Sequence, residues 1–527
     1  MSTFVQVHRD SIIGTLSGFD RLRLRGTMRL LAHVGGMMDY LRQMGVRLKE
    51  FAGYAQSVTQ QVRQATEQVA RAAGRPLLYL PSSSENKERR ARLIAEEDHI
   101  QDGLICVLSS VEPCYSYDIY RNRETRQIEL RRREVKCKHY YHYMIHPVLG
   151  FMHVRLQTWF PFTVHICING REWLARLMDK AGIAYLRQDN CFLTISDPQQ
   201  AQVLFDGQLR TQWPAMLDRL VRQINPAHPG VFRRCPVPYY WTVDESEWAT
   251  DVMFRSARAL KALYPRLLRH GMQVLGSVDV MRFLGRRVPT HRNIGHGGIH
   301  NAFKGEVITD LKARPEGVRI KHRVNANSVK MYDKQGSVLR VETTINHPRD
   351  MKVYRTKEGD PGGQKSWRYL RKTVVDLRRR AQVCQASNDR YLDAMAAAEA
   401  STPLSELAQP VCKPVTWKGK RARAINPLNH EDAALLEAVS RGEFSLNGFR
   451  NRDLRPLLYT AKTRPGPQEI RRQSAAITRK LRLLRAHRLI RKVPHTHRYV
   501  VSPTGRRVIT ALLLARQADT KTLIQAA

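Results

Sequence analysis

The sequence predicts a multidomain α+β protein, and three observations lead to this class. The chain has 527 residues, 42% of them hydrophobic, and at roughly 150 residues per domain this length corresponds to about three to four compact units. Segments with helical periodicity are followed by blocks with the two-residue alternation of strands. A stretch with three prolines, residues 401–415, precedes a C-terminal segment that has its own apolar pattern.

Five segments are expected in order along the chain. Residues 1–75 should form a strand pair followed by long helices, and residues 76–270 an α/β region. This region should hold a βαβ unit and then antiparallel strands, rich in aromatic and basic residues, from Tyr115 to about Ile168. Residues 271–399 should hold a second strand block and a long basic helix over 366–398. Residues 400–416 read as a linker before a C-terminal domain, 417–527.

The net charge indicates an anionic partner. Lysine and arginine number 88 against 47 acidic residues, which gives +41, and so large a charge repels itself in a compact state. We therefore expect DNA, RNA or both as the partner. No stretch approaches the ~18 apolar residues of a membrane span, and the N-terminus lacks a secretion signal, so a cytoplasmic protein is expected. Eight scattered cysteines without a CxxC pair suggest reduced thiols and no zinc finger.

The C-terminal domain has the order of a winged helix. Three helices, within 431–444, 447–459 and 468–490, precede a hairpin and a final helix. In the third helix an apolar face should pack inward, formed by Ile470, Ile477, Leu481 and Leu484. The opposite face suits a DNA major groove and carries Arg471, Arg472, Thr478, Arg479, Arg482 and Arg485. The hairpin, or wing, should follow the phosphate backbone through Arg491, Lys492, His495, His497 and Arg498.

The phrase LLRAHRLIRKVPHTHRYVVSPTGRRV in this domain resembles the winged-helix domains of MarR-type transcriptional regulators. The resemblance covers about the last hundred residues and implies a DNA-binding domain. A winged helix used for RNA or for protein contacts is the alternative, because a fold alone does not fix function.

Residues 317–346 predict three consecutive strands with turns at Asn-Ala-Asn and Gln-Gly. On the first strand, alternation places one apolar face (Val318, Ile320, His322 and Val324) opposite a basic row (Arg319, Lys321 and Arg323). On the third strand, Leu339, Val341 and Ile345 should face inward, which leaves Arg340, Glu342 and Thr344 outward. With Lys330 and Tyr332 from the middle strand, the outward surface would suit a phosphate backbone.

The phrase VKMYDKQGSVLRVETTIN in this block resembles a motif of phage gene-II-type and plasmid rolling-circle replication initiators. The resemblance implies a metal-assisted nick in DNA, with Tyr332 as nucleophile, Glu342 as metal ligand or base and Lys330 supplying positive field. Mg²⁺ or Mn²⁺ would be the cofactor. The alternative is that Glu342 only pairs with a neighbouring cation.

Other residues are candidates for binding a metal ion or for stacking on nucleobases. Asp244, Glu247 and Asp251 have the spacing of one helical face and could hold Mg²⁺, or could pair with arginines. Asp20 could be the first-strand aspartate of an RNase H-like nuclease. A glycine-rich loop carries His291, His296 and His300, which could bind zinc or copper or be solvated. Tyr141 and Tyr143 could stack unpaired bases or belong to an ordinary core.

We expect a nucleic-acid-binding protein that processes DNA for a mobile element, plasmid or phage. In its concrete form it is a replication-initiator-like or transposase-like nuclease that cleaves a strand. The alternative is a non-enzymatic binder, either a DNA-binding regulator or an RNA-binding component of a ribonucleoprotein, including an RNA-guided one.

Overall fold

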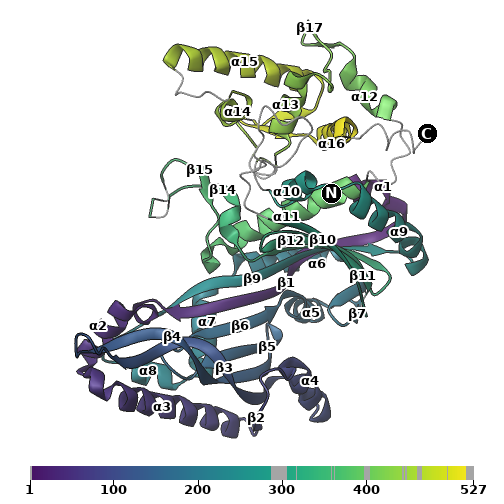
Figure 1. The fold of residues 1–527 in the computed structure, drawn as a ribbon. Helices are drawn as coiled ribbons and strands as arrows, with labels where there is room; N and C mark the ends of the chain where they lie inside the picture. The colour runs from purple at the N-terminus through teal and green to yellow at the C-terminus, as the bar shows by residue number, and fades with distance from the viewer. Residues whose placement is uncertain are drawn as a thin grey trace. The chain divides into compact units, whose positions relative to one another are not determined.

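A computed structural model describes most of the chain (Figure 1). It covers residues 3–285, then 306–396 apart from 316, 358 and 361, and then 404–517 apart from 442–443, 445–447, 460–465 and 495. The described chain divides into two compact units. Unit 1 comprises Met1–Ser17, Ala249–Leu370 and Arg379–Ala527, and unit 2 comprises Gly18–Trp248 and Arg371–Arg378. Both units combine helices with sheet, so the expected multidomain α+β class is confirmed.

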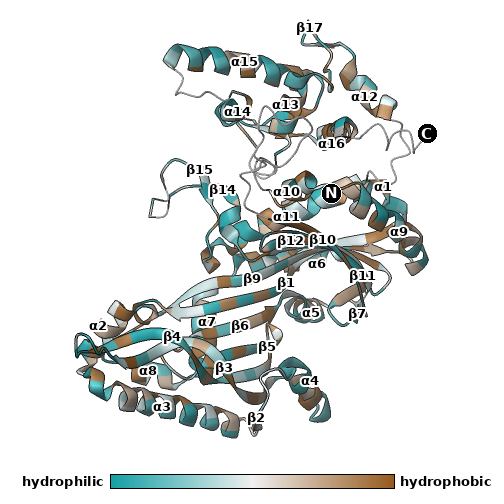
Figure 2. Cartoon of the chain, in the orientation of Figure 1, coloured by the Kyte–Doolittle hydropathy of each residue, from teal (hydrophilic) through white to brown (hydrophobic). Residues whose placement is uncertain are grey.

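Unit 2 is built on a mixed sheet. Two long strands, β1 (Ile12–Met28) and β9 (Tyr239–Phe254), contribute residues to both units. The strand order in unit 2 is β9-β1-β6-β5-β4-β3-β2, and its other strands are β2 (Leu77–Tyr79), β3 (Gly103–Arg121), β4 (Ile128–His146), β5 (Gly150–Gln157) and β6 (Val164–Asn169). The pairs from β3 to β6 are antiparallel, and β6 is antiparallel to β1. Brown and teal alternate along β5 and β6 in Figure 2, as expected of strands with one buried face.

Helices pack on this sheet around an aromatic core. They are α2 (Val34–Met44), α3 (Phe51–Ala72), α4 (Lys87–Glu97), α5 (Gly170–Ala181), α6 (Pro198–Gly207), α7 (Trp213–Ile224) and α8 (Ala227–Val231), with the short 3-10 turns η2 (Leu30–Ala32), η3 (Leu48–Glu50), η4 (Gln208–Arg210) and η6 (Val374–Asp376). A small hairpin, β7 (Tyr185–Gln188) and β8 (Cys191–Ile195), completes the unit. The ring of Phe160, in the connection between β5 and β6, lies 5.9 Å from that of Tyr40 on α2 and 6.1 Å from that of Phe51 on α3.

Several expectations for this unit are confirmed. The βαβ unit is present, because α4 joins the parallel strands β2 and β3. The long N-terminal helices and the antiparallel strands up to Ile168 are also present. The strand pair expected at the start of residues 1–75 is wrong, since Ile12–Met28 form the single strand β1.

The central part of unit 1 combines sheet strands with helices. Its strand order is β10-β11-β12-β13-β9-β1, where β10 is Val307–Arg314, β11 is Gly317–Val324, β12 is Asn327–Lys334 and β13 is Val338–Ile345. The three strands expected over 317–346 are confirmed with their turns. The remaining elements are α1 (Thr3–Val7), η1 (Arg9–Ser11), α9 (Ala257–Gln273), α10 (Ser277–Phe283), η5 (Pro348–Asp350), β14 (Lys352–Arg355), β15 (Ser366–Tyr369) and α11 (Leu377–Met395). The long basic helix thus begins at Leu377, because residues 366–369 pair as a strand with β14.

The C-terminal part of unit 1 has its own core. Its elements are α12 (Leu404–Cys412), β16 (Val415–Trp417), β17 (Lys420–Ala422), α13 (His430–Val439), α14 (Asn451–Leu458), α15 (Pro467–Ala486), β18 (Ile490–Lys492), β19 (Tyr499–Val501) and α16 (Pro503–Gln517). The expected order of three helices, a hairpin and a final helix is confirmed from α13 to α16. Its core includes Leu436, Ile477 and Ile509, all fully buried.

The linker expected over residues 400–416 is wrong for its described part. Residues Leu404–Cys412 form α12, and Val411 packs into the same core as α15 and α16. The buried Val411 explains the difference, because the proline pattern does not show that apolar side chains of this segment pack into a core, and α12 continues through Pro410. None of the helices that the structure describes has the length and apolarity of a membrane span.

Candidate nucleic-acid interface

The strongest candidate site is a groove between the β16–β17 hairpin and the C-terminal half of α15. Eight of its twelve lining residues are cationic and none is acidic. The cations are Lys418, Lys420, Arg421, Arg423, Arg479, Lys480, Arg482 and Arg485, and we call this site the basic groove. The other lining residues include Trp417. An open surface with this composition suits a polyanion.

The hairpin places an aromatic ring at the basic groove. Trp417 pairs with Lys420 across the two-residue turn Lys418-Gly419. Both turn residues have positive φ, 51° and 71°, which matches the turn that joins closely paired strands, and glycine adopts this conformation without steric cost. The Arg485 guanidinium lies 4.9 Å from the centroid of the Trp417 ring, and the Lys418 ammonium lies 5.4 Å from it. The indole is therefore set among the cations.

The helix α15 contributes its cations from the side opposite its core face. Ile477, Leu481 and Leu484 are buried, as predicted, while Arg479 and Arg482 are exposed. Arg485 lies in the last turn, where cations interact favourably with the negative end of the helix dipole. The amphipathic period of the sequence therefore fixes which side chains reach the basic groove.

Two of the eight cations have carboxylate partners. The Arg423 guanidinium contacts both Asp432 oxygens, at 2.7 and 2.6 Å, and the Lys480 ammonium lies 3.0 Å from Glu431 Oε2. Burial alone would raise the pKa of Asp432, but hydrogen bonds from Arg423 outweigh it and the pKa is lowered. Among the described carboxylates, none forms a salt bridge with the other six cations. The basic groove keeps a strong positive excess.

The other residues predicted on α15 lie outside the basic groove. Arg471 and Arg472 are exposed near the start of the helix, and Arg472 pairs with Glu469 at 2.7 Å. The Thr478 hydroxyl donates to the Ser474 carbonyl at 2.9 Å, so its hydrogen bond stays within its own helix.

Three of the predicted wing residues are exposed, and Arg498 contacts an aromatic ring. Arg491 and Lys492 are exposed on β18. Arg498 stacks over Tyr354 of β14, with 3.9 Å between the guanidinium carbon and the ring centroid. His497 is exposed, and His495 lies outside the described residues.

The basic row predicted on β11 is largely compensated by acids. Arg319 pairs with Asp310 at 3.2 Å, and Arg323 lies 3.5 Å from Glu306. Burial, together with the neighbouring Lys330 and Arg319 charges, lowers the pKa of Lys321. This row offers less net charge to a phosphate backbone than the basic groove does.

The outward surface predicted for β13 is wrong. Arg340, Glu342 and Thr344 are all buried, with exposed fractions of 0%, 1% and 6%. The alternation of the sequence correctly separates two faces of the strand, but both faces are covered. The charges are tolerated because each has an opposite charge beside it.

The three residues of the predicted nicking centre do meet. The Tyr332 hydroxyl donates to Glu342 Oε2 at 3.0 Å, and the Lys330 ammonium lies 2.6 Å from Glu342 Oε1. Lys330 and Glu342 are direct neighbours across β12 and β13. Tyr332 is 7% exposed, so the group forms a buried network in the sheet.

The acidic residues predicted on one helical face lie on the strand β9 instead. Asp244 pairs with Arg25 at 2.7 Å, and Glu247 with Arg21 at 3.1 Å. Asp251 belongs to unit 1 and pairs with Arg340 at 2.6 Å. Spacings of three and four residues suit a helix, but here they coincide with a strand whose carboxylates meet arginines of other strands. The salt-bridge alternative describes these contacts.

The remaining candidates have structural contacts. Asp20 lies buried on β1, where its carboxylate accepts from the Asn190 amide at 2.6 Å and from Arg171 at 3.3 Å. Tyr141 and Tyr143 are buried in an apolar cluster, in agreement with the core alternative. The histidine loop with His291, His296 and His300 lies outside the described residues.

The sequence interpretation missed the hairpin half of the basic groove. The signal was the phrase Trp417-Lys-Gly-Lys420, in which Lys-Gly occupies a two-residue turn between short strands. This signal is weak in the sequence because it directly follows the proline-rich stretch that predicts a linker.

Comparison of the chain with protein-family models, with curated proteins and with solved structures found no match. The resemblances to MarR-type regulators and to replication initiators are therefore neither supported nor contradicted by relatives. The arguments on function below depend on the geometry of the described residues.

Proposed function

We propose that this protein binds nucleic acid and that the basic groove holds the phosphate backbone. The observation that carries the proposal is the gathering of eight cations on one groove, six of them without a described carboxylate partner. Counterions released from the nucleic acid would drive binding, and the overall charge of +41 would speed encounter. A winged-helix reading of α13–α16 agrees with this role and belongs to the same proposal.

Trp417 predicts that the basic groove prefers nucleic acid with unpaired bases. An indole beside a track of cations can stack on an unpaired base while the cations follow the backbone. Base stacking contributes about 1–3 kcal/mol per base, so the basic groove should favour a single strand or a duplex end. Trp417→Ala is expected to weaken single-strand binding while leaving the affinity for a blunt duplex nearly unchanged. Equal losses on both would remove stacking from the proposal.

The test compares two double variants of the full chain. Arg479→Ala with Arg482→Ala removes two groove cations, whereas Arg471→Ala with Arg472→Ala removes two cations of the same helix outside the groove. Fluorescence anisotropy with labelled single-stranded DNA, single-stranded RNA and duplex DNA measures Kd. Losing two charge-assisted contacts costs about 1.5 kcal/mol or more, so the groove variant should bind about tenfold or more weakly.

Salt titration of the same samples supplies the control for mechanism. Each neutralised phosphate contributes about 0.9 to the slope of log K against log salt for B-DNA and about 0.7 for single strands. The groove variant makes about two fewer phosphate contacts, so its slope should be smaller by the contribution of two contacts. Equal affinities for the two double variants, or a flat salt response of the wild type, would overturn the proposal.

Strand cleavage is the second candidate function. It rests on the contact of Tyr332 and Lys330 with Glu342, the group that the replication-initiator resemblance selects. Because Tyr332 is 7% exposed, a phosphate can reach its hydroxyl only after the covering residues move. Incubation of the bound substrates with Mg²⁺ or Mn²⁺ tests for a nick. Cleavage that is lost in Tyr332→Phe would support this function, and intact substrate in every condition would leave a non-enzymatic binder.

A further inference from the structure

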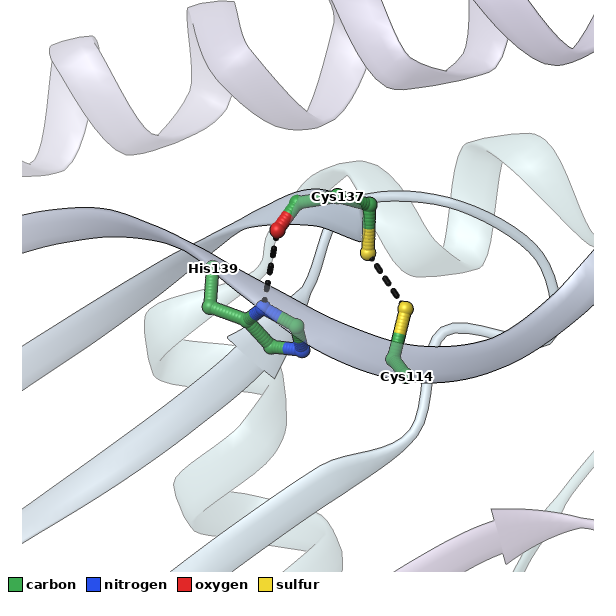
Figure 3. A group of neighbouring side chains, drawn as sticks. All are labelled: Cys114, Cys137 and His139. Carbon is green, nitrogen blue, oxygen red and sulfur yellow. Dashed lines mark hydrogen bonds between the residues drawn. The ribbon is translucent and has the colours of Figure 1, made fainter. Parts of the chain in front are cut away.

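A cluster of metal-ligating side chains lies in unit 2, on the hairpin of β3 and β4 (Figure 3). Cys114 comes from β3, and Cys137 and His139 come from β4. One ligand atom of each lies within 4.8 Å of the others. The two Sγ atoms are 2.7 Å apart, and both cysteines are free thiols. The cluster is independent of the basic groove, which belongs to unit 1.

The strand register brings these three residues to one face of the hairpin. Cys137 and His139 are two residues apart on β4 and so share a face. Across the pair of strands, Cys137 is opposite Glu112, and Cys114 is opposite Val135. Cys114 is therefore the diagonal neighbour of Cys137, within reach of its side chain. The arrangement is fixed by the sheet and not by a loop.

A hydrogen bond fixes the tautomer of His139. Its Nδ1 lies 3.1 Å from the Cys137 carbonyl oxygen, which can only accept, so Nδ1 carries the proton. In the neutral ring the lone pair is then on Nε2. Histidines that ligate metals typically donate their other N–H to a carbonyl or carboxylate in this way. The ring, 2% exposed, is held in the form that a metal requires.

We propose that Cys114, Cys137 and His139 bind a zinc ion, with water in the fourth position. Two sulfurs and an imidazole are soft or borderline ligands, which select zinc over Mg²⁺ or Ca²⁺. Two thiolates neutralise the ion, so the site adds no net positive charge beside Arg155 and Lys87. Three protein ligands and an open position are the pattern of zinc sites that handle a bound water or substrate.

Glu112 is not counted as a ligand because its carboxylate is already engaged. Lys87 and Arg155 lie 3.2 and 2.9 Å from it, and the Tyr141 hydroxyl donates to it at 2.7 Å. Zinc–sulfur bonds of about 2.3 Å place two thiolates of a tetrahedral site about 3.8 Å apart. The pair must therefore open by about 1 Å on binding, which a change of side-chain rotamer at two neighbouring strand positions can supply.

The test measures metal binding of the full chain kept under a reducing agent. After incubation with Zn²⁺ and removal of excess, elemental analysis should find one zinc ion per chain. Co²⁺ should give the thiolate-to-metal charge-transfer band and the visible bands of a tetrahedral site. Cys114→Ser, Cys137→Ser and His139→Gln should each weaken zinc binding at least about tenfold in a chelator competition. Cys412→Ser, at an exposed cysteine of unit 1, is the matched control and should bind normally.

Each other outcome overturns the proposal. Zinc that remains bound in the Cys114 and Cys137 variants must come from other ligands. A reduced wild type that takes up no zinc, but joins these two cysteines in a disulfide when the reductant is removed, identifies a redox pair instead. Circular dichroism of every variant should match the wild type, which establishes that the variant is folded. His139→Gln retains both thiols and so separates loss of a ligand from loss of the sulfur pair.

Discussion

Arg340 and Asp251 form a buried ion pair with two parallel hydrogen bonds in unit 1. The Arg340 Nε atom lies 2.6 Å from Asp251 Oδ1, and Nη2 lies 2.8 Å from Oδ2. Each side chain is 1% exposed. The planar guanidinium matches the carboxylate at both oxygens, which is the geometry in which a buried charge pair is tolerated. The strands β13 and β9 that carry the two residues are neighbours in the sheet.

Removing one partner of this pair should cost more stability than removing both. Asp251→Asn leaves the Arg340 charge buried without its full counter-charge, and we expect the free energy of unfolding to fall by about 3–5 kcal/mol. Asp251→Leu combined with Arg340→Met removes both charges and should lose less than Asp251→Asn alone. Urea denaturation followed by circular dichroism measures both. A loss below about 1 kcal/mol for Asp251→Asn would contradict the importance of the pair.

The same pair shows where sequence reasoning succeeds and where it stops. The alternation on β11 correctly placed Ile320 and His322 inward, because a two-residue period is local. It could not show that β13 is covered on both faces, since the partner of Arg340 is distant in the chain. Asp251 was placed on a helix for the same reason. Acidic residues spaced by three and four can lie on one face of a helix, or on a strand where they pair with arginines of other strands. The sequence pattern is the same in both cases.

Only the α15 side of the basic groove is predictable from the sequence. The cationic face of α15 follows from helical period, and Arg479, Arg482 and Arg485 were identified by it. The β16–β17 hairpin is only three residues per strand and has no alternation long enough to recognise. Its role depends on packing against α15, which is a tertiary contact. The Cys114 cluster was missed for a related reason, because its ligands lie on two strands and form no sequence motif.

Replacing Glu342 should affect stability more than replacing Tyr332. Glu342→Gln leaves the Lys330 ammonium, 15% exposed, without its carboxylate, whereas Tyr332→Phe removes one hydrogen bond. We expect losses of about 1.5–3 kcal/mol for Glu342→Gln and about 1 kcal/mol for Tyr332→Phe. Thermal denaturation gives the order. Tyr332→Phe is thus the better variant for cleavage assays, because its fold is retained; a larger loss than for Glu342→Gln would reverse this choice.

The helix α12 should be needed for a stable C-terminal fragment. Val411 is 2% exposed in the core, and its carbonyl accepts from the Ile425 amide at 2.9 Å. Burying a valine contributes about 1.5–3 kcal/mol, so a fragment of residues 404–527 should be more stable than one of residues 417–527 by at least about 2 kcal/mol. Urea denaturation of the two fragments measures the difference. Val411→Ala in the longer fragment is the control and should lie between them; equal stability of the fragments would make α12 a linker after all.

Acid should destabilise unit 1 in part through His322. Its ring is fully buried, with Nε2 3.0 Å from the Tyr391 hydroxyl and Nδ1 2.9 Å from the Thr309 hydroxyl, and burial lowers its pKa to about 4. In the unfolded chain a histidine has a pKa of about 6.5, so between these values the unfolded state binds a proton that the folded state does not. The contribution of His322 to stability is therefore full above pH 6.5 and falls as the pH drops to 4. Between pH 7 and pH 4.5 the wild type should lose about 2–3 kcal/mol more than His322→Gln, because the other buried histidines titrate equally in both proteins. Parallel stability curves for the two proteins would show that the pKa of His322 is not depressed.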